Sequence, residues 1–64
     1  MSRKARSVVT DLFRAFLAEP RLLPPEFQAR AGADRARAIA DYIAGMTDRY
    51  AMLEHRRLFA IETV

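Results

Sequence analysis

The sequence predicts an all-α fold in which two long antiparallel helices are joined by a proline-rich connection that contains a short helix. Apolar residues recur at helical spacing over residues 3–18 and again over residues 35–61. All three prolines lie between these stretches, within residues 20–25. Two amphipathic helices alone form a small core, so we expect the fold to be completed by oligomerisation or by a parent domain.

The first predicted helix runs from Arg3 to Ala18. It ends there because Pro20 disfavours helical backbone geometry at the preceding residue, Glu19. The polar face carries Arg6, Ser7, Thr10, Asp11 and Arg14. The apolar residues gather on one broad face, as in a helix that packs against a core: Ala5, Val8, Val9, Leu12, Phe13, Phe16 and Leu17.

The connection is rich in proline and also apolar. Leu22 and Leu23 are unusual in an exposed link, so we expect them to fold back onto the first helix. Pro25 suits the first position of a short helix, where Glu26 would face the positive helix end and Phe27 would turn inward. This helix should end at residues 31–33.

The second long helix is predicted from Arg35 to Ile61, with Asp34 as its N-cap. One apolar stripe contains Ile39, Ile43, Met46, Tyr50, Leu53 and Ile61, and a second set lies on nearly the opposite side: Ala38, Gly45, Met52 and Phe59. A helix that is apolar on both sides is contacted on both sides. The predicted packing or interface residues are therefore Ile43, Gly45, Met46, Tyr50, Met52, Leu53 and Phe59.

Gly45 interrupts the predicted second helix, since a mid-helix glycine costs about 1 kcal/mol relative to alanine. Another element could pass close to the backbone at Ala44 and Gly45. Alternatively, the helix kinks or breaks there and becomes two helices. We favour close approach, because Gly45 lies in line with Met52 and Phe59.

Composition limits the chemistry of the chain. Its 64 residues include no cysteine and one histidine, His55, so disulfides and a zinc cluster are excluded. Asp41 and Asp48 project the same way, but about 10 Å of helix rise separates them, so we expect solvated or arginine-paired carboxylates. We find no glycine-rich phosphate loop, no nucleophile triad and no membrane-spanning run, and we expect no catalytic, metal-ligating or cofactor-binding residue in this chain.

The charge balance is mildly basic, with 11 Lys and Arg against 8 Asp and Glu, a net charge of +3. Such an excess permits a polyanionic partner without requiring one. Five arginines decorate the second helix without forming one continuous stripe: Arg35, Arg37, Arg49, Arg56 and Arg57. We therefore favour a solvated charged face over a nucleic-acid-binding surface.

Two segments of the second helix resemble a known family. These are DYIAGMTDRYA at residues 41–51 and HRRLF at residues 55–59. Both resemble the C-terminal signature of bacterial deoxyguanosinetriphosphate triphosphohydrolases and their dGTPase-like relatives in the HD-domain superfamily. ARSVVTDLF at residues 5–13, followed by Leu22-Leu23-Pro24, resembles the same region in the same order. The resemblance covers essentially the whole chain.

The resemblance implies that residues 1–64 are a single helical segment, the C-terminal subdomain of a larger all-α hydrolase. Enzymes of this family use a divalent metal such as Mg²⁺ or Mn²⁺ to split a deoxynucleoside triphosphate into deoxynucleoside and triphosphate. Their metal ligands belong to an earlier part of the protein that this sequence lacks. Basic residues at the start of the first helix of this region lie near the triphosphate in the family, and Arg3 and Lys4 match them.

The favoured interpretation is a structural and assembly segment of such an enzyme, inactive alone and cytoplasmic. Its expected partner is the catalytic domain of the parent enzyme or another copy of itself, as a dimer or higher oligomer, with no membrane involved. A free-standing helical dimerisation or regulatory module is the alternative. A small basic nucleic-acid-binding protein is a weaker third alternative.

Overall fold

The computed structural model describes residues 5–60, and within this range the fold is all-α, as the sequence predicts. Residues 5–60 form helices and contain no β-strand. The elements are α1 (Arg6–Ala18), the short 3₁₀ helix η1 (Pro20–Leu22), α2 (Pro25–Ala31), α3 (Arg35–Ala44) and α4 (Asp48–Phe59).

Helix α1 confirms the first predicted helix, although in the described residues it begins at Arg6. The predicted positions Arg3 and Lys4 lie outside those residues. The helix ends at Ala18 because Glu19, which precedes a proline, adopts a non-helical backbone with φ −140° and ψ 85°. Its inward side chains are spaced four residues apart and are all buried: Val8, Leu12 and Phe16.

The connection folds back onto the helices, as its apolar residues predict. Leu23 is buried, and Leu22 packs against the core from its edge. The side-chain amide of Gln28 in α2 donates hydrogen bonds to the backbone carbonyls of Arg21, at 3.2 Å, and Leu23, at 2.7 Å. Pro25 occupies the start of α2, with Glu26 in its first turn. The connection is therefore held at a fixed position beside α2.

The predicted single helix from Arg35 to Ile61 is wrong, because the chain breaks after Ala44 into α3 and α4. Asp34 does cap α3 as predicted, since its carboxylate accepts a hydrogen bond from the backbone N–H of Arg37 at 3.1 Å. Thr47 caps α4 in the same manner, accepting from the N–H of Tyr50 at 3.0 Å. A side-chain oxygen at this position satisfies an N–H that lacks a partner within the helix, which favours a new helix start.

Gly45 is the C-cap of α3, and among residues 5–60 no other element makes the close approach that we favoured for it. A Cβ atom built on Gly45 would meet the carbonyl oxygens of Asp41 and Tyr42 at 3.6 and 3.7 Å, both within its own helix. Its backbone is right-handed, with φ −81° and ψ −5°. The glycine therefore marks a helix end, which is the second of the two interpretations.

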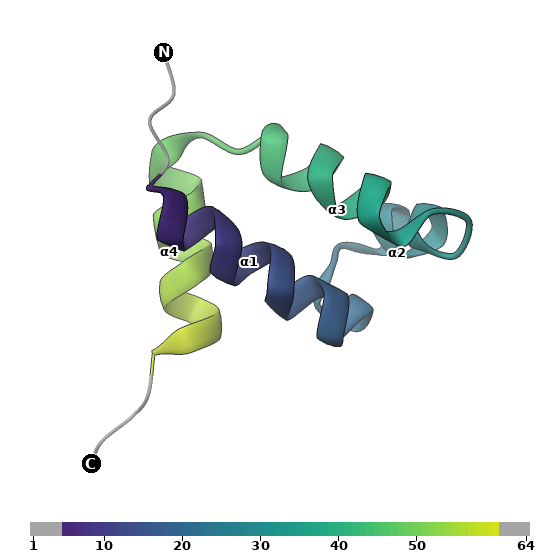
Figure 1. Ribbon diagram of the computed structural model, residues 1–64, viewed down its shortest axis with the longest axis horizontal. Helices are drawn as coiled ribbons and strands as arrows, with labels where there is room; N and C mark the ends of the chain where they lie inside the picture. Colours follow the sequence, from purple (N-terminus) through teal and green to yellow (C-terminus); the bar gives the residue numbers. More distant parts are fainter. Residues whose placement is uncertain (1–4, 61–64) are drawn as a thin grey trace.

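The helices form a thin layer, in which α1 and α3 lie side by side and run in roughly opposite directions (Figure 1). Helix α2 packs against α3, and α4 crosses α1 at the opposite end of the layer (Figure 1). The molecule measures 37 × 33 × 16 Å. Its thickness is little more than that of one helix with its side chains, about 10–12 Å. The buried apolar core is correspondingly small: Val8, Leu12, Phe16, Leu23, Ala31, Ala38, Ile39, Ile43, Met46 and Ala51.

Candidate functional site

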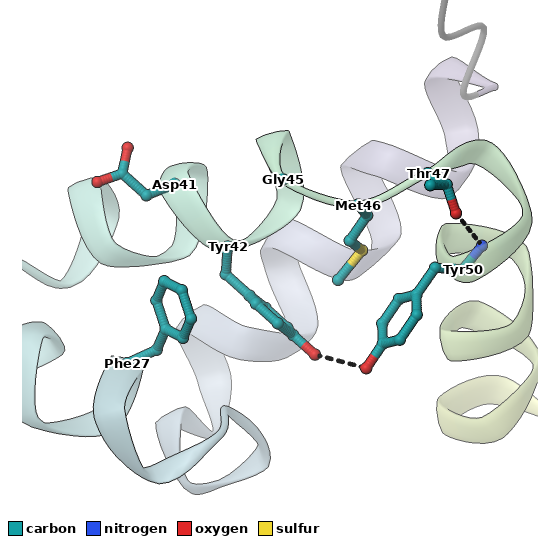
Figure 2. Close-up of a pocket in the computed structure, with 7 residues that line it drawn as sticks. All are labelled: Phe27, Asp41, Tyr42, Gly45, Met46, Thr47 and Tyr50. Atoms are coloured by element: carbon teal, nitrogen blue, oxygen red, sulfur yellow. Dashed lines mark hydrogen bonds between the residues drawn. The ribbon is translucent and has the colours of Figure 1, made fainter.

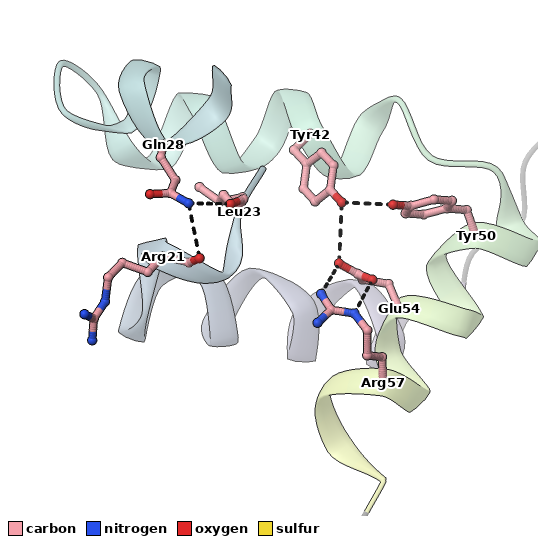
Figure 3. A network of polar contacts seen from close by, with 7 residues as sticks. All are labelled: Arg21, Leu23, Gln28, Tyr42, Tyr50, Glu54 and Arg57. Atoms are coloured by element: carbon pink, nitrogen blue, oxygen red, sulfur yellow. Dashed lines mark hydrogen bonds and ion pairs between the residues drawn. The ribbon is translucent and has the colours of Figure 1, made fainter. Parts of the chain in front are cut away.

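A polar network joins α3 to α4 around the buried carboxylate of Glu54, whose side chain is 8% exposed. The guanidinium of Arg57 donates two hydrogen bonds to this carboxylate, Nε to Oε1 at 2.9 Å and Nη2 to Oε2 at 2.7 Å. The hydroxyl of Tyr42 donates to Oε2 at 3.4 Å and lies 3.3 Å from the hydroxyl of Tyr50 (Figure 3). Tyr42 is the residue of α3 through which this network reaches α4.

The network shifts the proton affinities of its members. The hydrogen bonds from Arg57 lower the pKa of the Glu54 carboxyl below its ordinary value, which keeps this buried group ionised. Burial, followed by the hydrogen bond with Tyr50, raises the pKa of the Tyr42 hydroxyl well above its ordinary value. Tyr42 is therefore a neutral hydrogen-bond donor, and neither group is poised to exchange a proton near neutral pH.

A groove of about 320 Å³ lies beside this network, between α2, α3 and the start of α4. Figure 2 shows the rings of Phe27, Tyr42 and Tyr50 along it, with Met46 between the two tyrosines. At its rim, the carboxylate of Asp41 forms ion pairs with Arg30 and Arg37. Asp41 is therefore an arginine-paired carboxylate, one of the two states that we expected for it. The complete lining is Phe27, Asp41, Tyr42, Gly45, Met46, Thr47 and Tyr50.

A second groove, of about 300 Å³, lies between α1 and α3. Its lining is wholly apolar: Val9, Phe13, Ala40, Ile43 and Ala44. At 100° per residue, Ala40 and Ala44 project from the side of α3 opposite to Tyr42. The thin layer therefore carries one groove on each side of α3, and the one between α1 and α3 is lined only by apolar side chains, which offer contact area but no side-chain hydrogen bonds.

His55 connects α4 to α1, where its Nε2 lies 2.8 Å from a carboxylate oxygen of Asp11. Its ring also packs on Phe59, with centroids 4.7 Å apart. One imidazole and one carboxylate are too few to hold a divalent ion, and within residues 5–60 no group of three or more potential ligands comes together. The described residues thus do not fit the metal that the family resemblance implies.

The predicted interface residues separate into three sets. Ile43 and Met46 are buried in the core of the chain itself. Gly45 and Tyr50 line the groove of Figure 2. Met52, Leu53 and Phe59 are 55, 53 and 41% exposed on α4. Contact of the exposed set with a partner stays a prediction.

Three of the five arginines considered for nucleic-acid binding make contacts within the chain. Arg37 binds Asp41, Arg57 binds Glu54, and Arg35 donates to the backbone carbonyl of Leu17 at 3.3 Å. Arg49 and Arg56 are exposed on α4, and no ion pair to either is found among residues 5–60. The free cations of the second predicted helix thus lie on one element, beside the exposed apolar set.

Comparison with known proteins identifies the family of this chain. The phosphohydrolase-associated domain matches residues 1–57, which is most of the chain. The chain belongs to this family. No solved structure gives a significant match. Within the described residues, no helix is long and apolar enough to cross a membrane.

The chain is similar to deoxyguanosinetriphosphate triphosphohydrolase-like proteins of several bacteria. It is 69% identical over 61 residues to that of Azoarcus sp. strain BH72, which covers 95% of the chain and 16% of the relative. It is 64% identical over 64 residues to that of Ralstonia nicotianae, covering 100% of the chain and 16% of the relative. The chain thus spans about one sixth of the length of the relatives it matches.

Sequence reasoning missed two of the residues that organise the site. Thr47 follows Gly45 by two positions and precedes Asp48, which is the usual pattern of a helix end followed by a new helix start. That signal was available in the sequence. Glu54 carried no such signal, because its burial depends on where α3 and Tyr42 lie relative to α4.

Proposed function

We propose that this chain is the C-terminal structural and assembly segment of a metal-dependent deoxynucleoside triphosphate triphosphohydrolase, and that it packs against the part of that enzyme that holds the metal. Two observations carry the proposal. The chain is a family member that spans 16% of its relatives, and it exposes apolar side chains both in the α1–α3 groove and on α4. A cytoplasmic location is part of the proposal. The segment supplies shape and contact area to the enzyme, while the chemistry belongs to the remainder.

The experiment compares three proteins: the Azoarcus relative without the matching segment, a chimera in which residues 1–64 replace that segment, and the isolated chain. We expect the truncated relative to lose dGTP hydrolysis in the presence of Mg²⁺ or Mn²⁺, and the chimera to recover it. The isolated chain should release no triphosphate above a buffer blank. Full activity of the truncated relative, or chelator-sensitive hydrolysis by the isolated chain, would overturn the proposal.

Arg3 and Lys4 enter the proposal as cations near the bound triphosphate. Helix α1 has no acidic residue in its first turn, and Arg6 is its first residue. A cation at this position opposes the helix dipole at about 0.3–1 kcal/mol, so folding alone does not favour Arg6 there. In the chimera, Arg3→Ala and Lys4→Ala should raise the KM for dGTP without lowering the melting temperature. Unchanged kinetics in both variants would show that these two side chains lie in solvent and do not contact the triphosphate.

Self-association through α4 is a second candidate, favoured by the exposure of Met52, Leu53 and Phe59. Soluble monomers rarely leave a large contiguous apolar patch exposed. Light scattering of the isolated chain tests this candidate across a concentration series. A folded monomer at high micromolar concentration, with a melting temperature independent of concentration, would exclude it.

A further inference from the structure

The outer face of α4, defined by Arg49, Met52, Leu53, Arg56 and Phe59, combines apolar side chains with two free cations. All five residues are exposed. At 100° per residue, Arg49 and Arg56 project in nearly the same direction, about 10 Å apart along the axis. Met52 and Phe59 lie along one flank of this arginine ridge, and Leu53 lies along the other. An exposed helix face of this composition is typical of an interaction surface.

The outer face is held in a fixed orientation. The opposite side of α4 contacts α1, where Ala51 is fully buried and His55 meets Asp11. A third contact joins α4 to α3, where the hydroxyl of Tyr42 donates a hydrogen bond to the carboxylate of Glu54 (Figure 3). Helix α4 cannot roll to hide Met52 and Leu53 without breaking these contacts. Any cover for the outer face must come from outside the described residues.

Charge decides what kind of surface can cover this face. A symmetric contact with a second copy would set one arginine ridge against another and remove water from unpaired guanidinium groups, which is unfavourable. Most carboxylates of this chain already accept hydrogen bonds within it: Asp11, Glu19, Asp34, Asp41 and Glu54. A second copy therefore offers few acidic groups. A phosphate backbone would match the arginines but not Met52, Leu53 and Phe59.

We infer that the outer face of α4 docks on a surface of the same longer polypeptide, outside residues 1–64, where two carboxylates about 10 Å apart are flanked by apolar side chains. This inference rests on the proposed function and deepens it, because it names the docking face and the chemistry of its partner. The relatives contain about six times the length of this chain, so they have the sequence to supply that surface. Arg49 and Arg56 then act as register-setting contacts, and Met52, Leu53 and Phe59 supply buried area.

The test uses the chimera with the Azoarcus relative, in which Met52 is replaced by the photo-crosslinker benzoylphenylalanine. Proteins labelled with ¹⁴N and ¹⁵N are mixed, so mass spectrometry separates contacts within one polypeptide from contacts between copies. We expect a crosslink within one polypeptide, to a peptide outside the grafted segment that contains Asp or Glu. A crosslink to the outer face of α4 in another copy overturns the inference. So does the lack of any crosslink, or a crosslink that forms only after duplex DNA is added.

Charge reversal tests the arginine ridge itself. Arg49→Glu combined with Arg56→Glu should lower the Met52 crosslink yield about tenfold, the change that corresponds to ~1.4 kcal/mol. The matched control is Arg14→Glu combined with Arg21→Glu, which changes charge equally at exposed positions on α1 and η1. An equal loss in both variants would show that net charge alone matters and would overturn the inference.

A second crosslinker position separates this inference from the proposed function. With benzoylphenylalanine at Ala40, the α1–α3 groove is probed in place of α4. A crosslink from Ala40 to the rest of the polypeptide, with none from Met52, overturns the docking of α4 while leaving the proposed function intact. A failure at both positions overturns both.

Discussion

At the scale of single residues, Glu54 is the side chain whose position departs most from a simple amphipathic helix. It occupies a buried position on α4 where an apolar side chain would satisfy the helical pattern. Three hydrogen bonds from Arg57 and Tyr42 compensate for its removal from water. The carboxylate therefore contributes to the fold only while it is ionised and paired.

The pH dependence of stability follows from this pairing. The folded-state pKa of Glu54 lies below its ordinary value of 4.5, so its contribution is fully present above that pH and is lost as the pH falls through the lowered folded-state pKa. Glu54→Gln should destabilise the chain at pH 7 by about 1–3 kcal/mol and flatten the acid limb. Urea unfolding between pH 3 and 7 measures both effects. Glu26→Gln, at an exposed position on α2, is the control, and an unchanged acid limb in Glu54→Gln would contradict the assignment.

At the scale of secondary-structure elements, local signals predicted what local sequence determines. Asp34 was correctly predicted to cap a helix, and Pro20 and Pro25 correctly delimited the connection. The break between α3 and α4 was only the second of two interpretations, because the apolar residues Ile43, Met46 and Tyr50 keep helical spacing across it. Periodicity reports which residues face the core and does not register a short non-helical link. The turn signal at Gly45 and Thr47 was the better guide.

A substitution at Gly45 tests how α3 ends. Because its backbone is right-handed and a Cβ atom there would make ordinary contacts, Gly45→Ala should stabilise the isolated chain by about 0.4–1 kcal/mol. The gain arises because alanine lowers the conformational entropy of the unfolded chain. Thermal unfolding with circular dichroism measures it. A lower melting temperature for Gly45→Ala would mean that another element does approach this backbone closely.

At the scale of the whole molecule, thinness explains why so much apolar surface stays exposed. A layer 16 Å thick buries the inner sides of α1, α3 and α4 but leaves a groove lined by apolar side chains between α1 and α3. The sequence predicted that a partner surface was missing, since the second predicted helix is apolar on two sides. It did not predict the position of this groove, which depends on how Val9 and Phe13 of α1 meet Ala40 and Ala44 of α3.

A substitution in this groove should have an effect whose size depends on whether the rest of the polypeptide is present. In the isolated chain Ala40 is exposed, so Ala40→Glu should change the free energy of unfolding by less than about 0.5 kcal/mol. In the chimera, an apolar surface of the remaining polypeptide should cover the groove and bury the new carboxylate without a partner, at a cost of about 1–3 kcal/mol or more. Paired unfolding curves and dGTP hydrolysis rates measure the difference.

The matched control is Ala29→Glu, at an exposed position on α2 that lines neither groove. It should be nearly silent in both contexts, because its carboxylate stays in water wherever the groove is covered. Equal, small effects of Ala40→Glu in the chain and in the chimera would mean that the groove stays open to solvent. In that case α4, rather than the α1–α3 groove, would have to carry the contact with the rest of the chimera.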